Sequence, residues 1–192
     1  NNNVASQFIK HANKSIPGYE MGHDLIISIA KDILPPQARI LDIGCSTGYL
    51  LDKISNISDS KSTLYGIDIS SEMIKFAKNN SAKKIKFYCK DIHKFKEDNF
   101  DLIISYFTMQ FVPLKLKIHF LKKVFSKLNI GGKFIIFEKV SNNSGGLKNI
   151  FEHSYRDFKL KNGYSALTIF NKDESLRGAM FCATREQNLS FF

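Results

Sequence analysis

The ten residues from Leu41 to Leu50, LDIGCSTGYL, constrain the fold of this chain more than any other stretch. The apolar run over residues 38–43 predicts a strand that ends at Gly44, and the pattern over residues 49–54 predicts the start of a helix. Between them lie two glycines, Gly44 and Gly48, four positions apart. The stretch therefore predicts a strand, a tight turn that needs small residues, and a helix.

The same alternation continues along the chain. Several apolar runs are apolar at consecutive positions, as is typical of strands that are covered on both faces. The predicted strands are Arg39–Ile43, Ser62–Ile67, Lys84–Cys89, Phe100–Tyr106 and Gly132–Val140, and the predicted helices are Tyr49–Ile57, Ser71–Asn79 and Lys115–Leu128. This succession predicts an α/β fold, a doubly wound and mainly parallel sheet with flanking helices.

Helical cap elements are predicted on both sides of this 38–140 core, over residues 1–30 and 145–192, within a single domain of 192 residues. The sequence SNNSGG at 141–146 predicts a loop before the last third, where only Ala166–Phe170 has weak strand character. A complete doubly wound sheet has further strands after this point. We therefore expect either that the native chain continues or that a second subunit covers the sheet edge. The apolar end of the chain, LSFF, has a helical pattern and favours a homodimer.

The composition excludes several classes of protein. No apolar run reaches the roughly 20 residues that cross a bilayer, and the N-terminus lacks a signal-peptide pattern, so a cytoplasmic protein without a membrane partner is predicted. The three cysteines, Cys45, Cys89 and Cys182, are widely spaced and are interpreted as free thiols. The 5 histidines show no ligand spacing, so no metal is predicted.

The net charge of +10 raises the question of nucleic-acid binding, because phosphate contacts need clustered lysines and arginines. The lysines, however, are scattered over every segment, and arginine, the residue favoured for bidentate contacts, is scarce. A solvated surface is the favoured interpretation, and direct nucleic-acid binding is the less favoured one.

Candidate ligand-binding residues follow each predicted strand, where open α/β sheets bind their ligands. Asp68 follows the second strand, 20 positions after Gly48, a spacing suited to binding the two hydroxyls of a ribose. Asp91 follows the third strand, where a carboxylate and a backbone amide suit the edge of an adenine. The fourth and fifth strands are followed by FTMQF at Phe107–Phe111 and by Glu138. Together these positions predict a cofactor that contains a nucleoside.

The glycine loop separates two kinds of cofactor. A nicotinamide dinucleotide calls for G-x-G-x-x-G, whereas this loop has Ser46 between two glycines four apart. It resembles motif I of class I S-adenosyl-methionine-dependent methyltransferases, in which an acidic residue, here Asp42, stands two positions before the first glycine. The resemblance implies S-adenosyl-L-methionine as the cofactor, with its methionyl part beside the loop. Cys45 has no activating neighbour in the sequence and is interpreted as a small loop residue, not as a nucleophile.

A closer resemblance covers most of the chain. The segments SIPGYE (15–20), DIGCSTG (42–48), FTMQF (107–111), FEK (137–139) and DFKLKNGYSAL (157–167) together resemble carboxy-S-adenosyl-methionine synthases. Members of that family convert S-adenosyl-methionine and prephenate into carboxy-S-adenosyl-methionine, which serves a partner enzyme that modifies wobble uridine in tRNA. The resemblance implies a cofactor site lined by Tyr19, Gly44, Cys45, Ser46, Asp68, Ile69, Asp91 and Ile92, to which we add Asp42, Gly48 and Tyr106.

Two positions depart from that family. Tyr106 stands where the family has an asparagine against the cofactor, and Asp173 stands where it has an arginine that pairs with the extra carboxylate. An aspartate repels a carboxylate, which leaves Lys172 and Arg177 as substitute cations.

Because methyl transfer requires only a nucleophile aligned with the methyl group, the favoured prediction is a methyltransferase acting on a small molecule, acidic molecules included. Carboxy-S-adenosyl-methionine synthase is the alternative. A tRNA-acting methyltransferase and a non-catalytic cofactor-binding subunit are further alternatives. The acceptor site is expected between the N-terminal segment, FTMQF and residues 145–170. No catalytic residue is assigned, and the candidates are His153, Tyr164 and Arg156.

Overall fold

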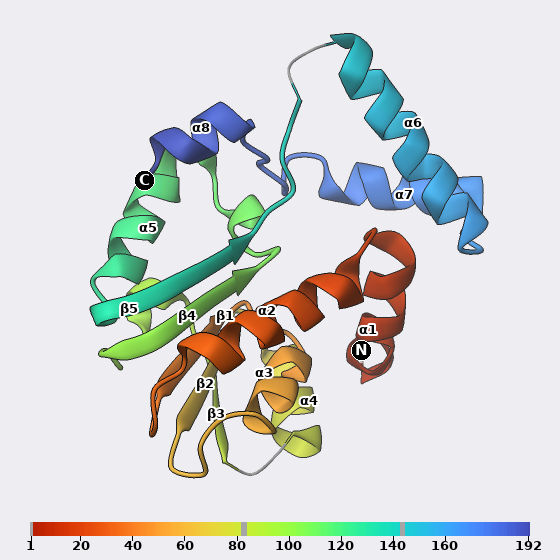
Figure 1. The fold of residues 1–192 in the computed structure, drawn as a ribbon. Helices are drawn as coiled ribbons and strands as arrows, with labels where there is room; N and C mark the ends of the chain where they lie inside the picture. Colours follow the sequence, from red (N-terminus) through yellow and green to blue (C-terminus); the bar gives the residue numbers. More distant parts are fainter. Residues whose placement is uncertain (1, 82–83, 143–144) are drawn as a thin grey trace.

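The computed structural model describes residues 2–81, 84–142 and 145–192. Its centre is a five-stranded sheet in the order β3-β2-β1-β4-β5, in which every pair of neighbours is parallel (Figure 1). The strands are β1 (Arg39–Ile43), β2 (Thr63–Asp68), β3 (Ile85–Cys89), β4 (Phe100–Tyr106) and β5 (Leu128–Phe137). The prediction of a doubly wound parallel sheet is confirmed.

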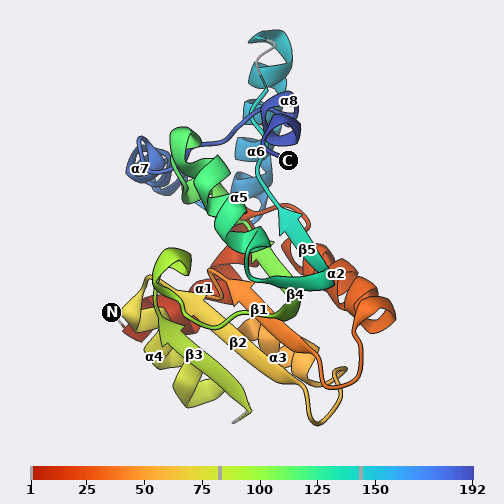
Figure 2. The same cartoon turned by 90° about the vertical axis from the view of Figure 1, so that its left-hand side faces the viewer.

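Helices cover both faces of the sheet. Ile40 of β1 packs with residues of α2 and α3 on one face, whereas Leu41 points to the other face and packs with α5 and η1. The helices are α1 (Asn2–Ser15), α2 (Tyr19–Ile33), α3 (Tyr49–Ser55), α4 (Ser71–Asn80), η1 (Ile92–Lys94), η2 (Met109–Phe111), η3 (Leu114–Leu116) and α5 (Lys117–Phe125), followed by α6 (Gly145–Lys161), α7 (Ala166–Leu176) and α8 (Arg185–Ser190). The helices α6 and α7 extend beyond the carboxyl ends of the strands (Figure 2). Successive strand residues alternate between the two cores, which explains the continuous apolar runs.

Three predicted segments were wrong. The helix predicted to reach Leu128 ends at Phe125, and β5 begins at Leu128 and not at Gly132, because Gly131 (φ 78°) lies in an irregularity within the strand, not after a helix. Ala166–Phe170 belongs to α7, because Ser165 caps that helix by accepting a hydrogen bond from the Thr168 amide at 3.1 Å.

The predicted loop 141–146 is shorter, because Gly145 already begins α6; residues 143 and 144 lie outside the described residues. Ser141 pairs instead with the C-terminal segment, donating its amide to the Ala183 carbonyl at 2.8 Å. The final helix ends at Ser190, so the last two residues are not helical. Helices occupy both predicted cap segments, and the assignment of all three parts to one domain stays a prediction.

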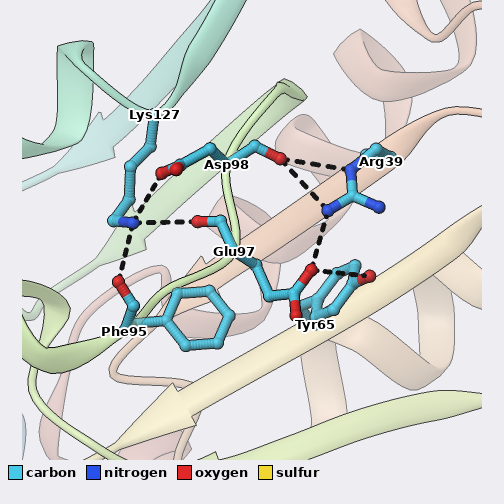
Figure 3. A network of polar contacts seen from close by, with 6 residues as sticks. All are labelled: Arg39, Tyr65, Phe95, Glu97, Asp98 and Lys127. Carbon is cyan, nitrogen blue, oxygen red and sulfur yellow. Dashed lines mark hydrogen bonds and ion pairs between the residues drawn. The ribbon is translucent and has the colours of Figure 1, made fainter.

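A polar network holds the amino ends of the strands, at the opposite edge from the predicted ligand site (Figure 3). Lys127 is 1% exposed, and its ammonium donates to the carbonyls of Phe95 and Glu97 and to Asp98 Oδ1, each at 2.8 Å. Arg39 donates to the Asp98 carbonyl and pairs with Glu97 Oε2 at 3.1 Å. The network therefore anchors the loop before β4 to the starts of β1 and β5.

None of the helices in the described part of the chain has the length and apolar character to cross a membrane.

Candidate functional site

The glycine loop joins β1 to α3 at the carboxyl edge of the sheet. Gly44 and Gly48 have φ angles of 75° and 79°, in the left-handed region that favours glycine. A Cβ at Gly44 would lie 2.2 Å from Thr108 Oγ1, and a Cβ at Gly48 would lie 2.6 Å from Phe87 Cζ. Both glycines are therefore required by the backbone conformation and by the space.

Asp68 fixes this loop against the start of α4. Its Oδ2 accepts the Ser46 amide at 2.9 Å, and its Oδ1 accepts the Ser70 amide at 2.8 Å. Each carboxylate oxygen can accept a second hydrogen bond. Asp68 thus has the capacity to bind ligand hydroxyls while it also holds the glycine loop in place.

A surface hollow of about 490 Å³ lies next to Asp68 and is lined by Ile69, Cys89, Lys90, Asp91 and Lys94. Ile69 is 79% exposed, which is unusual for an isoleucine and offers an apolar platform beside two carboxylates. Asp91 caps η1 by accepting the His93 amide at 2.8 Å, whereas Ile92 is buried beneath. An apolar platform between carboxylates fits a nucleoside, with a base on Ile69 and a ribose at Asp68.

Asp42 is buried under the loop, with 3% of its surface exposed. Its Oδ1 has no hydrogen-bond partner among the described residues. Burial and, secondarily, the charge of Asp68 raise the pKa of Asp42 to about 7. A buried carboxyl with one unpartnered oxygen at this position fits a ligand that brings a cationic group, such as the α-ammonium of a methionyl moiety.

Tyr19 and Tyr106 join the start of α2 to the carboxyl end of β4. The Tyr106 hydroxyl donates to the Tyr19 carbonyl at 2.5 Å, and the two ring centroids are 5.3 Å apart. Gly22 lies against Tyr106, because a Cβ there would come within 2.3 Å of the hydroxyl oxygen. In this structure Tyr106 positions Tyr19 and α2.

A second group joins α2 to α3, and sequence reasoning missed it. Glu20 accepts a hydrogen bond from the Tyr49 hydroxyl at 2.9 Å and pairs with Lys53. His23 is buried beside this pair, and burial lowers its pKa to about 4, so the ring is neutral at pH 7. No local pattern signals this group, because its members belong to two helices 29 to 33 residues apart.

The catalytic candidates lie apart from the strand ends. His153 is exposed on α6, where it pairs with Asp157 at 3.6 Å, and Arg156 is exposed on the same helix. The Tyr164 hydroxyl lies 2.9 Å from His11 Nδ1 and so joins the α6–α7 connection to α1. No contact within the described residues brings these three side chains to the strand-end residues.

Asp173 has an ion-pair partner, and the two cations near it in the sequence are exposed. Asp173 Oδ1 accepts a hydrogen bond from Lys159 Nζ at 3.2 Å. Lys172 is exposed, and the Arg177 side chain is 78% exposed and pairs with Glu174 at 2.7 Å. The two substitute cations suggested by the sequence are therefore both exposed, Lys172 on α7 and Arg177 directly after that helix.

All three cysteines are free thiols. Burial, followed by the charges of Asp42 and Asp68, raises the pKa of Cys45, so it is a neutral thiol at pH 7. In the part of the chain that the structure describes, no group of at least three His, Cys, Asp or Glu side chains is arranged to hold a metal ion.

The parallel sheet, the glycine loop and the carboxylates at the strand ends define an α/β domain of the methyltransferase class. Residues 35–183 match the family model described as a methyltransferase domain. The structure is similar to that of the plantazolicin methyltransferase BpumL, crystallised with a substrate analogue and SAH (TM-score 0.69, 19% identity, 99% of this chain and 72% of that one). It is also similar to the structure of the Bacillus halodurans protein BH2331 (TM-score 0.64, 12% identity, 88% of this chain and 65% of that one).

Sequence relatives indicate a particular family within the methyltransferase class. A carboxy-S-adenosyl-L-methionine synthase of Staphylococcus epidermidis is 34% identical over 96% of this chain and 82% of its own length. A protein of the same name from Nautilia profundicola is 33% identical over 97% of this chain and 80% of its own. The chain belongs to the carboxy-S-adenosyl-L-methionine synthase family, an S-adenosyl-methionine-dependent branch of the methyltransferase fold.

Proposed function

We propose that this protein is a carboxy-S-adenosyl-L-methionine synthase that uses S-adenosyl-L-methionine and prephenate. The similarity to synthases of this name, at 34% identity over 96% of the chain, carries the proposal. With that coverage it includes most of the chain, in which two segments resemble these synthases and not methyltransferases in general: SIPGY, between α1 and α2, and NGYS, between α6 and α7.

The site supports S-adenosyl-L-methionine as the ligand. Asp68, Ile69 and Asp91 would hold the nucleoside, and the glycine loop with Asp42 would hold the methionyl part. When bound, this cofactor supplies a sulfonium-activated methyl group. The chain contributes the carboxylates, the apolar platform and the loop that orient that group.

The preference for methyl transfer rested on Asp173, and the structure weakens that argument. Asp173 forms an ion pair with Lys159, so its charge is offset within the chain and does not repel an incoming carboxylate as a free aspartate would. With this objection reduced, the synthase becomes the better supported of the two activities.

In the proposed reaction the carboxyl group that prephenate gives up would replace one hydrogen of the methyl group. Prephenate would become phenylpyruvate, and its hydroxyl group and that hydrogen would leave as water. Atoms and charge therefore balance without a further oxidant or reductant.

Mass spectrometry of carboxy-S-adenosyl-methionine and of phenylpyruvate tests the proposal. We expect both products in equal amounts from the purified protein with S-adenosyl-methionine and prephenate. Asp68→Asn should weaken cofactor binding by about tenfold or more, since a charged acceptor is lost, while Asp59→Asn, in the turn before β2, should not. Methylation of an acceptor with no carboxylated product would return the methyltransferase assignment.

A cytoplasmic homodimer remains part of the proposal. Ile150 and Phe151 on α6 and Leu167 and Phe170 on α7 are each more than half exposed, which supports a protein interface. Light scattering should give a mass of about twice 21.9 kDa. A monomer mass at micromolar concentration would contradict the dimer.

A further inference from the structure

Two lysines from separate elements converge on one tyrosine ring. Lys159 Nζ lies 4.1 Å from the ring centroid of Tyr155, one turn earlier on α6. Lys139 Nζ, just after β5, lies 5.0 Å from the same centroid. The electron-rich face of a tyrosine attracts each ammonium group, but two cations at one ring also repel each other.

The positive charge of this group is only partly offset. Lys159 is 4% exposed, and of its three N–H donors one is used, in the hydrogen bond to Asp173. Among the described residues the Lys139 ammonium has no hydrogen bond or ion pair. The nearby carboxylate of Glu138 is turned to Lys117, at 3.7 Å. Buried ammonium groups are normally fully paired, so Lys159 has capacity for a further anionic acceptor, and the exposed Lys139 can contribute a second ammonium group to it.

The Lys139 end of this group lies next to η2, which follows β4 at the carboxyl edge of the sheet. The Lys139 amide donates to Gln110 Oε1 at 3.2 Å. Gln110 belongs to η2, two residues after the Thr108 side chain that contacts Gly44. Lys139 directly follows the carboxyl end of β5, and α6, which carries Lys159, extends beyond that end of the strand (Figure 1).

We propose that Lys159 and Lys139 bind the carboxylate that carboxy-S-adenosyl-methionine carries and S-adenosyl-methionine lacks, and that Asp173 orients Lys159. The inference rests on the proposed function. It assigns binding of the extra carboxylate to a lysine on α6 and a lysine after β5, not to position 173. Asp173 is then a positioning residue. Two ammonium groups thereby replace one guanidinium as the partner of a carboxylate.

Calorimetric binding of carboxy-S-adenosyl-methionine and of S-adenosyl-methionine separates this role from general cofactor binding. Lys139→Gln and Lys159→Gln should each weaken binding of the carboxylated ligand by about tenfold or more, and that of S-adenosyl-methionine by less than about twofold. Lys159→Arg should retain the preference. Lys161→Gln, an exposed lysine at the end of the same helix, should leave both affinities unchanged and serves as the matched control.

The exposed Lys139 makes the test decisive even if the buried Lys159→Gln variant does not fold. An unchanged ratio of the two affinities in Lys139→Gln would overturn the proposal. If the wild-type protein prefers the carboxylated ligand and releases phenylpyruvate while the lysine variants keep that preference, only this inference fails. If the wild-type protein shows neither property, the proposed function fails with it.

Discussion

Cofactor affinity should depend steeply on pH because of Asp42. Its carboxyl is buried without a partner for Oδ1, and its pKa is raised from 3.8 to about 7. A cationic ligand group beside it favours the ionised form, so binding releases a proton wherever Asp42 is protonated in the free protein.

The expected size follows from the ionised fraction. With a pKa of about 7, roughly 3% of Asp42 is ionised at pH 5.5 and half at pH 7.0, so affinity should rise about 15-fold over this interval. The α-amino group of the ligand, with an ordinary pKa of about 7.7–8.0, stays protonated throughout. Isothermal titration calorimetry in two buffers of different ionisation enthalpy measures both the affinity and the released proton.

The Asp42→Asn variant isolates this carboxyl. Its affinity should be nearly constant from pH 5.5 to 7.0, whereas Asp24→Asn, which removes an exposed carboxylate from α2, should retain the wild-type slope. An equal slope in Asp42→Asn and the wild type, or a flat wild-type profile, would refute the reasoning.

In the ligand-free protein, ionisation of Asp42 lowers the free energy of unfolding, whereas in the complex it favours binding. The folded-state pKa of Asp42 lies above its ordinary value, so its contribution to stability is present at low pH and is lost as the pH rises from about 4 through 7. Asp42→Asn should therefore stabilise the ligand-free protein at pH 8, by an amount on the order of 2–4 kcal/mol.

Three further changes test other parts of the structure. Lys127→Met leaves three oxygen acceptors without their buried donor and should lower the free energy of unfolding by about 3 kcal/mol in urea denaturation, while Lys122→Met on the exposed side of α5 should change it little. Gly22→Ala should lower the free energy of unfolding by about 1–3 kcal/mol, because the new Cβ meets the Tyr106 hydroxyl. Adding Tyr106→Phe should recover part of this loss. If the losses of the two single variants simply add in the double variant, the contact is contradicted. Ile69→Ala should leave thermal unfolding unchanged, because the side chain is exposed, but should weaken cofactor binding about fivefold if a ligand packs on it; equal affinity would exclude the platform.

Much of the fold follows from local patterns. The first four strands begin and end within one residue of the predicted bounds, because each contains an apolar run that polar or small residues delimit on at least one side. The start of β5 was missed because Gly131 and Gly132 signal a helix end as readily as a strand irregularity. Ala166–Phe170 was missed because five residues are too few to distinguish a strand from a helix by periodicity.

The candidate site was predictable where residue type and strand position carry the signal, as for Asp68 and the glycine loop. The link from Glu20 to Lys53, the contact of Gly22 with Tyr106 and the convergence of Lys139 and Lys159 on one ring were not. They join residues that are far apart in the chain, and local sequence does not encode their distances.

The sequence by itself determined the alternation of strands and helices, the acidic residues at the strand ends and the glycines of the loop. These depend on side-chain size, backbone freedom and apolar periodicity, which act within a few residues. Only the tertiary structure decided the partners of the charged and buried groups: Lys159 for Asp173, Tyr19 for Tyr106, and a vacant hydrogen-bonding position on Asp42. Packing of distant elements fixes the distance between charges, and that distance, not the identity of a residue, determines whether an aspartate repels a ligand or positions the lysine that binds it.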